Sequence, residues 1–343
     1  MDYAAIDLHK TASQIRIITN GETVDCRIPT TRDRLRITFE GRARMRVLLE
    51  AATESEWVAQ LLETLGHEVI VADPNYTPMY GERSRRVKTD RRDVVALAEA
   101  CRLGLYRQVH RRSAENWAVQ WHLTVRDQLV WARTRAIVLI RCLARMGGVH
   151  IAMAGHAETF VKRLELTELP PAVHHAITPL AAMIAMLNGH IAETDAYFKA
   201  TAEADPRMRR LMSMPGIGPI TAAAFVAAID EVTIFRGPGQ VTSYLGLVPR
   251  EYSSGDQLRR GRIVPSAHPR VQSLLVEAAW RIWRSANPDT QALRDWAQAV
   301  GQRRGKRVAA IALARRLARI LYAMWRDETD YTATRIRPRR AAA

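Results

Sequence analysis

Short runs of apolar residues, typical of β-strands, recur through the first 72 residues of the chain. These runs cover residues 3–7, 13–19, 22–28, 45–49 and 69–72. Asn20-Gly21 lies between the second and third runs and is a strong signal for a two-residue hairpin turn. The pattern therefore predicts five strands, of which the first three are antiparallel.

Capping residues predict three helices among and after these strands. The helices begin after Thr31, after Ser55 and at Asp90, and end near residues 39, 65 and 103. Gly66 and Gly104 follow the second and third helices, where a glycine commonly ends a helix. The resulting order β-β-β-α-β-α-β-α is that of the ribonuclease H and RuvC type of nuclease. We therefore expect an α/β domain of this type over residues 1–112.

Residues 113–205 follow helical periodicity and predict a mainly α-helical connector. Two apolar stripes carry the pattern: Trp117, Trp121, Val125, Leu129 and Ala132, and then Leu180, Met183, Leu187, Ile191 and Phe198. Glycines and prolines between 147 and 171 separate the two helices. The near-heptad spacing suits either a helical hairpin packed within one chain or an oligomeric coiled coil. We expect the tryptophans to belong to the core rather than to stack on bases.

A third region begins after Asp205-Pro206, and we assign residues 206–330 to it. Gly216-Ile217-Gly218 precedes an alanine-rich helix and has the form of a helix-hairpin-helix motif. The free N–H groups at the start of its second helix can bind a DNA phosphate without reading sequence. A plain helix connection is the alternative. Residues 331–343 read as a basic tail.

The charge of the chain favours a nucleic-acid partner. The 343 residues contain 51 Lys+Arg against 35 Asp+Glu, for a net charge of +16, and only five of the cations are lysine. Arginine grips phosphate with two parallel hydrogen bonds. A biased genomic base composition can explain the choice of arginine over lysine, but it does not require the excess of positive charge.

The three cysteines are widely spaced, which fits neither a disulfide framework nor a zinc knuckle. No apolar run approaches the ~18 residues of a membrane span, and there is no signal peptide. We therefore expect a cytoplasmic protein with no membrane partner.

Four acids form the candidate catalytic and metal-binding set. Asp7 and Glu50 close two predicted strands, and Asp90 and Asp93 share one face at the start of a predicted helix. In a ribonuclease H-like fold these positions converge, and carboxylate oxygens are the ligands that Mg²⁺ prefers. Each acid taken alone is better explained as a helix cap or a solvated side chain, and only the four together favour a metal site.

Ser253-Ser254-Gly255 is followed by a cluster of arginines. Glycine permits close approach of a phosphate, and arginine can stabilise its developing charge. An ordinary turn explains the same residues.

The candidate nucleic-acid contacts are Lys10, Lys88, Arg91, Gly216, Gly218, Arg259, Arg260 and Arg262.

Several motifs together resemble one protein family. They are Ile6-Asp7-Leu8-His9-Lys10, Leu49-Glu50-Ala51, Lys88 to Asp93, Pro215 to Gly218, and Gly246 to Gly255. Their order and spacing resemble those of the DEDD-type insertion-sequence transposases related to pilin-gene invertases, as far as about Ala279. Val264 to Arg270 departs from the family pattern.

The resemblance implies a RuvC-like domain, a coiled-coil connector and a C-terminal transposase domain. It also implies that Asp7, Glu50, Asp90 and Asp93 bind Mg²⁺, and that a serine is the DNA nucleophile. Ser254 matches that serine best, with Ser253 as the alternative. The partners implied are donor and target DNA, a structured noncoding bridge RNA as guide, and further copies of the chain, from a dimer to a tetramer.

Three other interpretations remain open. A Holliday-junction resolvase would use the acids to activate water and would leave the serines in a structural turn. A scaffold that binds nucleic acid without catalysis would tolerate loss of the acids. Tyr252 is a less favoured nucleophile because it lacks the adjacent glycine.

Overall fold

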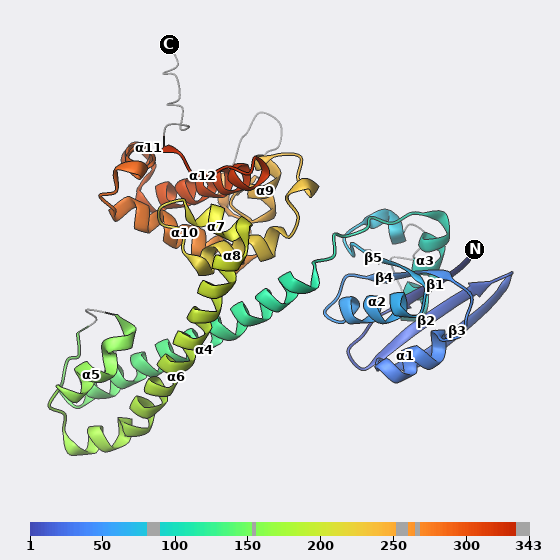
Figure 1. Ribbon diagram of the computed structural model, residues 1–343. Coiled ribbons are helices and arrows are strands. Elements are labelled where there is room, and N and C mark those ends of the chain that lie inside the picture. The colour runs from blue at the N-terminus through green and yellow to red at the C-terminus, as the bar shows by residue number, and fades with distance from the viewer. Residues whose placement is uncertain (81–89, 153–155, 252–259, 265–267, 334–343) are drawn as a thin grey trace, which may run out of the picture. The chain divides into compact units, whose positions relative to one another are not determined.

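The computed structural model describes residues 1–80, 90–152, 156–251, 260–264 and 268–333, and the side chains of Asp90, Glu251 and Arg260 are not described. The chain forms two compact units, Met1–Arg111 and Arg112–Ala343 (Figure 1). Within the described residues, no helix is long and apolar enough to cross a membrane.

The first unit is built on a mixed five-stranded sheet. Its strands are β1 (Asp2–Asp7), β2 (Ala12–Thr19), β3 (Glu22–Pro29), β4 (Met45–Glu50) and β5 (Glu68–Ala72). Their order is β3-β2-β1-β4-β5; β1 pairs antiparallel with β2 and parallel with β4. Asn20 and Gly21 both have positive φ, 45° and 90°, as a type I′ hairpin turn requires. The ribonuclease H-like order predicted from the sequence is confirmed.

Helices cover both faces of this sheet. Helices α1 (Arg32–Phe39) and α2 (Ser55–Thr64) pack on the face that carries Ile6 and Leu49. Helix α3 (Asp90–Leu103) packs on the opposite face, against Ala5 and Leu48. The short 3-10 helix η1 (Thr77–Tyr80) borders α3. Because successive strand residues point to opposite faces, every second residue of β1 and β4 faces α3.

Of the two predicted helix caps, one is confirmed and one is wrong. The Oγ1 atom of Thr31 accepts a hydrogen bond from the Arg34 N–H at 3.4 Å, as an N-cap does. Ser55 is instead the first residue of α2, and Glu54 precedes it as the N-cap residue. The Ser55 hydroxyl turns back and donates to the Ala52 carbonyl at 2.8 Å, closing the turn that leads into α2.

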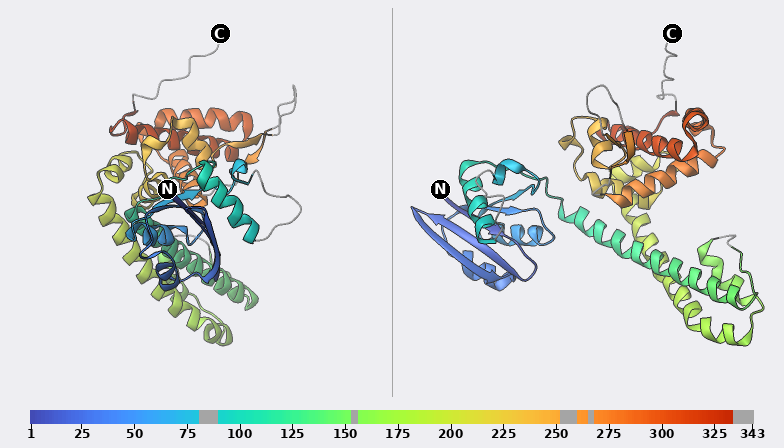
Figure 2. Two further views of the ribbon diagram at one scale, coloured as in Figure 1. Left: turned by 90° about the vertical axis from the view of Figure 1, so that its right-hand side faces the viewer. Right: turned by 180° about the vertical axis from the view of Figure 1, so that it is seen from behind.

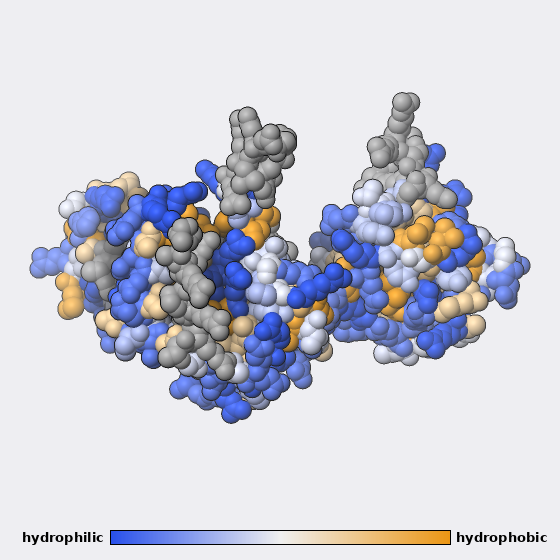
Figure 3. Space-filling view, turned by 90° about the horizontal axis from the view of Figure 1, so that it is seen from above, coloured by the Kyte–Doolittle hydropathy of each residue, from blue (hydrophilic) through white to orange (hydrophobic). Residues whose placement is uncertain are grey.

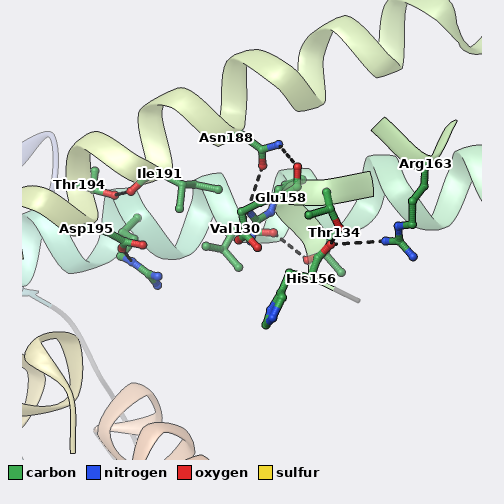
Figure 4. A network of polar contacts seen from close by, with 12 residues as sticks. Val130, Thr134, His156, Glu158, Arg163, Asn188, Ile191, Thr194 and Asp195 are labelled. Atoms are coloured by element: carbon green, nitrogen blue, oxygen red, sulfur yellow. Dashed lines mark hydrogen bonds and ion pairs between the residues drawn. The ribbon is translucent and has the colours of Figure 1, made fainter. Parts of the chain in front are cut away.

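The second unit begins with a hairpin of two long helices, α4 (Ala114–Met146) and α6 (Pro171–Ala204). The 3-10 helix η2 (Ala157–Thr159) and α5 (Phe160–Glu165) lie between them at the tip of the hairpin (Figures 1 and 2). At η2, the buried Arg133 side chain donates from Nη1 to Glu158 Oε1 at 2.9 Å and to Asn188 Oδ1 at 3.0 Å (Figure 4). This network ties the tip segment to both long helices.

The inner face of α4 differs from the one predicted. Trp121 is 64% exposed and Val125 is 54% exposed, so their predicted place in the core is wrong. Val119, Leu123 and Ile140 are the buried residues instead. The predicted stripe on α6 is confirmed: Leu187, Ile191 and Phe198 are buried, and Leu180 and Met183 are half-buried.

The rest of the second unit is a helical lobe with a short β-hairpin. Its elements are α7 (Pro206–Met212), α8 (Pro219–Ile229), η3 (Val232–Ile234), α9 (Pro238–Tyr244), β6 (Pro249–Glu251), β7 (Arg260–Ile263), α10 (Pro269–Arg284), η4 (Pro288–Thr290), α11 (Gln291–Arg304) and α12 (Lys306–Arg326). Helix α8 is buried from Thr221 to Ile229. Its alanines let α4, α6 and α10 approach closely, so α8 forms the centre of the lobe.

A strained turn at the end of α8 is hydrogen-bonded to the residues at the start of α4. Asp230 has φ 61° and ψ −59°, and the Glu231 N–H donates to the Ile229 carbonyl at 2.7 Å, which closes a γ-turn. The buried Asp230 carboxylate accepts from the Ser113 N–H at 3.1 Å, the Ser113 hydroxyl at 2.9 Å and the Asn116 amide. A non-glycine residue holds this backbone conformation only where its surroundings stabilise it.

Candidate active site and nucleic-acid contacts

Asp7 and Glu50 lie side by side at the ends of neighbouring parallel strands. Ile6 is paired with Leu49, so the next residues along β1 and β4 are Asp7 and Glu50. Both acids follow residues that face α1 and α2, which turns their own side chains toward the α3 face. Asp7 is 8% exposed and Glu50 is half-buried. The sheet thus brings two of the predicted acids together on one face.

Helix α3 brings Asp93 to the same end of the sheet. Near the end of α3, the Cys101 thiol donates to the Arg46 carbonyl near the start of β4 at 3.6 Å. Burial raises the pKa of Cys101 to about 12, so the thiol keeps its proton. Asp93 is eight residues before Cys101, which corresponds to about 12 Å along the axis of α3. Glu50 is four residues after Arg46, which corresponds to about 13 Å along β4. Asp93, which is 6% exposed, therefore lies level with Glu50.

The three described acids do not form an assembled ligand set. Among the residues that the structure describes, no group of three or more His, Cys, Asp or Glu side chains is placed to hold a metal ion. One oxygen of Glu50 accepts a hydrogen bond from the Tyr80 hydroxyl, which turns that carboxylate toward η1. Asp90 opens α3 as predicted, but its side chain lies outside the described residues.

Two neighbours of the acids were missed by sequence reasoning. His9 Nε2 lies 3.4 Å from Asp7 Oδ2, and Tyr80 contacts Glu50. The position of His9, two residues after Asp7, was an available signal. Tyr80 had no comparable signal, because 30 residues separate it from Glu50 and only the folded chain brings the two together.

The predicted cations near the acids are only partly described. Lys10, just beyond β1, and Arg91, in the first turn of α3, are exposed. Both can therefore reach a phosphate backbone at this end of the sheet. Lys88 lies outside the described residues.

The Gly216-Ile217-Gly218 segment connects α7 to α8 in a tight hairpin. Gly216 has φ +91°, and a Cβ atom there would lie 3.2 Å from the Ile282 side chain, so both conformation and packing favour glycine. Gly218 is the N-cap of α8 and is half-buried. Because most of α8 is buried, only its first residues near Gly218 can reach a phosphate, and phosphate binding there stays a prediction.

The predicted nucleophile lies between two described strands. Strands β6 and β7 pair antiparallel, with Pro249 opposite Ile263 and Glu251 opposite Arg260. Tyr252, Ser253, Ser254 and Arg259 belong to the intervening segment, which lies outside the described residues. Arg260 is in β7, but its side chain is not described, and Arg262 is exposed.

A buried histidine, His268, and an exposed tyrosine, Tyr244, lie near this β-hairpin. The rings of Tyr244 and His268 are 4.4 Å apart, and the Val264 N–H donates to the Val248 carbonyl at 3.0 Å. Burial, together with a smaller effect of the positive charge of Arg112, lowers the pKa of His268 to about 4, so this histidine is neutral at pH 7. His268 belongs to the segment that departs from the family pattern, and sequence reasoning did not single it out.

Comparisons with known proteins give a consistent result. A family model described as "Transposase", for the DEDD domain of IS110 elements, matches residues 4–146, and one described as "Transposase IS116/IS110/IS902 family" matches residues 208–294. A probable family 20 transposase of Pseudomonas aeruginosa is 33% identical over 331 residues, which cover 95% of this chain and 97% of the relative. The transposase of insertion sequence element IS1111A from Coxiella burnetii is 30% identical, covering 71% of this chain and 68% of the relative. The transposase of element IS1328 from Yersinia enterocolitica is 26% identical, covering 83% and 85%.

Proposed function

Because this chain belongs to the IS116/IS110/IS902 family of transposases, we propose that it cuts and rejoins DNA with two sets of residues. The chain is a DNA phosphoryl-transfer enzyme with an N-terminal DEDD domain that uses a divalent metal. The acids Asp7, Glu50, Asp90 and Asp93 are the first proposed set, and Ser254 is the second. We also propose residues 1–112, 113–205 and 206–330 as the catalytic, connecting and serine-bearing domains, with 331–343 as a basic tail.

The acids at the end of the sheet fit a hard divalent cation. Asp7 on β1 and Asp93 on α3 are almost fully buried carboxylates, and carboxylate oxygens are ligands for hard divalent cations. Oxygen-only ligands of this kind suit Mg²⁺. When bound, the cation polarises the scissile phosphate and offsets its developing charge. The three described acids supply its ligands from β1, β4 and α3, and Lys10 and Arg91 bind the neighbouring backbone.

Ser254 acts in the proposed reaction as the attacking group. Its Oγ forms a bond to the scissile phosphorus, the bond from phosphorus to the deoxyribose oxygen breaks, and the serine proton passes to solvent while the leaving oxygen takes up a proton. A hydroxyl of the second strand then attacks the phosphoserine, which releases Ser254. The number of phosphoester bonds is conserved, so rejoining needs no high-energy cofactor. Supporting evidence is the Ser254-Gly255 step, which lies in the sequence between β6 and β7 and precedes the exposed Arg262.

Guidance by a structured RNA of the same element completes the proposal. The support is the family membership and the net charge of +16, which suits both DNA and RNA. An altered guide sequence should redirect the DNA target without any change in the protein, because base pairing then reads the sequence. The measurement is a recombination assay with two RNAs that differ only in their target-pairing loops. Unchanged target choice with both RNAs would contradict guidance.

We further propose that α4 pairs with α4 of a second copy. The outer face of α4 carries a second heptad seam, opposite the buried one, at steps of four and three: Trp121, Val125, Gln128, Ala132, Arg135, Leu139, Cys142 and Met146. Leu139 is 47% exposed and Met146 is 79% exposed. Apolar residues at this spacing on two faces of one helix support both an internal hairpin and an association of copies.

Leu139→Glu should shift the protein toward the monomer, because it places a charge in the middle of the seam. Val138→Glu is the matched control, because Val138 is adjacent in sequence and 57% exposed but lies off the seam. Sedimentation velocity at micromolar concentration measures the mass of each variant. A wild-type protein that sediments as a monomer, or equal dissociation of both variants, would refute the pairing.

A further inference from the structure

The last part of the chain carries a strongly basic segment that none of the proposed contacts uses. Residues 296–326 contain eight arginines or lysines and no aspartate or glutamate. Four of the cations, Arg303, Arg304, Lys306 and Arg307, surround the single residue that separates α11 from α12. We call these four residues the α11–α12 corner. The corner lies beyond residues 208–294, where the second family model matches.

The backbone of this corner is tightly defined. Gly305 has φ +86°, a backbone conformation that lets α11 end at Arg304 and α12 start at Lys306 with only this glycine between them. One turn earlier, a Cβ atom on Gly301 would lie 2.8 Å from the Trp283 ring, so glycine allows α11 to pack closely against α10. The corner is therefore held by well-packed helices rather than by a long loop.

The four side chains are exposed and carry no compensating charge among the described residues. No described carboxylate forms an ion pair with Arg303, Arg304, Lys306 or Arg307. The hydrogen bond from Arg303 Nε to the Ala299 carbonyl at 3.3 Å is a local helix contact. Four like charges within five residues repel one another, and this repulsion opposes folding.

A purely structural role explains only half of the corner. Arg303 and Arg304 lie in the last turn of α11, where positive charge is favourable. Lys306 and Arg307 lie in the first turn of α12, where the helix dipole disfavours positive charge. The N-cap, Gly305, has no side chain to accept from the N–H groups that begin α12. An anion at this place would satisfy both the cations and those N–H groups.

The basic character continues along α12. Arg315 lies two turns beyond Arg307, and the exposed Arg319 follows one turn later. Arg316 stacks over the Trp296 ring of α11 at 4.8 Å, which orients this half-buried guanidinium. The side of the lobe that carries α11 and α12 in Figure 1 is covered mostly by hydrophilic residues in the view of Figure 3. A line of cations along one helix suits an extended polyanion better than a single small anion.

We infer that the α11–α12 corner, continued by Arg315 and Arg319, is a docking surface for a sugar-phosphate backbone. Its guanidinium and ammonium groups and the first N–H groups of α12 would contact phosphates and would not read bases. The inference rests on the proposed function only in that the bound polymer is nucleic acid. It adds a contact surface remote in sequence from both the acids and Ser254.

Arg303→Ala/Arg304→Ala/Lys306→Ala/Arg307→Ala in the full chain tests the surface. The control Arg145→Ala/Lys162→Ala/Lys199→Ala/Arg209→Ala removes four exposed cations elsewhere in the same unit. Fluorescence anisotropy measures binding of a duplex DNA and of an RNA hairpin between 50 and 300 mM salt. For duplex DNA, the slope of log K against log salt should become shallower by up to about 3.6, since each phosphate contact contributes about 0.9. The control should change the slope much less.

The two nucleic acids identify the ligand. A weaker slope with DNA alone assigns the surface to donor or target DNA, and a weaker slope with RNA alone assigns it to the guide. Unchanged slopes with both, or equal changes in corner and control variants, would overturn the inference. Each outcome can be read even if Ser254 is not the nucleophile, because binding and not cleavage is measured.

A second variant separates binding from folding. Lys306→Glu/Arg307→Glu places acids at the start of α12, where they favour the helix, so its melting temperature should equal or exceed that of the wild type. Nucleic-acid binding should nevertheless weaken at least tenfold at low salt. A lower melting temperature with unchanged binding would show that the cations serve the fold alone.

Discussion

Asp7→Asn should lower strand cleavage by at least about a hundredfold while the protein stays folded, because it removes one negative ligand from the set that holds the metal. The same is expected of Asp93→Asn. Asp7 on β1 and Asp93 on α3 are both almost fully buried, and asparagine keeps their volume. Each variant has one negative charge fewer among the neighbouring carboxylates, which lowers their mutual repulsion. In the absence of metal, the variants should therefore melt at or above the wild-type temperature. Cleavage of a labelled DNA substrate at several Mg²⁺ concentrations measures the effect.

Thermal melting with and without Mg²⁺ tests the same site without catalysis. The wild-type protein should gain stability as Mg²⁺ is added, because the ion binds the folded state, and Asp7→Asn should lose most of this gain. Asp33→Asn is the control: this exposed acid lies on α1, which covers the opposite face of the sheet. Full cleavage by an Asp7→Asn/Asp93→Asn double variant would exclude these acids from the reaction.

Ser254→Ala should abolish the covalent protein–DNA adduct and leave binding of RNA and DNA intact, since only one hydroxyl is removed. A substrate with a nick near the crossover point should trap the adduct with the wild-type protein. The adduct runs as a slower band in a denaturing gel, and mass spectrometry of the attached peptide identifies the residue. We expect a complete loss of the band, because no other group performs the same bond exchange.

Neighbouring residues provide the controls for this experiment. Ser253→Ala should still form the adduct, and so should Tyr252→Phe. A link to Ser253 would move the nucleophile by one residue, and a link to Tyr252 would change the class of recombinase. Cleavage with no adduct at all would favour a resolvase that activates water with the acids.

The sheet could be predicted because its signals are local. Alternating residues and the Asn20-Gly21 turn define β2 and β3, and each predicted strand differs from the observed one by one residue or less at either end. The strand order then follows from the order of elements. Asp7 and Glu50 could be placed together for the same reason, because parallel neighbours end at the same edge of a sheet.

Contacts between distant residues could not be predicted in the same way. The hydrogen bond from Tyr80 to Glu50 depends on where η1 packs, and no local pattern encodes that position. On α4 the sequence carries two heptad seams, offset by two residues, and periodicity alone does not tell which of them faces α6. The large tryptophan side chains favoured the outer seam as the buried one. In the structure the smaller Val119 and Leu123, which belong to the other seam, are the buried residues.

The γ-turn at Asp230 has a consequence for how such proteins can exchange parts in evolution. One carboxylate near the end of α8 holds Ser113 and Asn116, which lie more than 110 positions earlier and at the very start of the second unit. A gene fusion that replaced the first unit and cut after Asn116 would leave Asp230 in a strained backbone without its partners. Viable recombinants should therefore inherit Ser113 and Asn116 together with Asp230, so the heritable module begins at the point where the first unit ends.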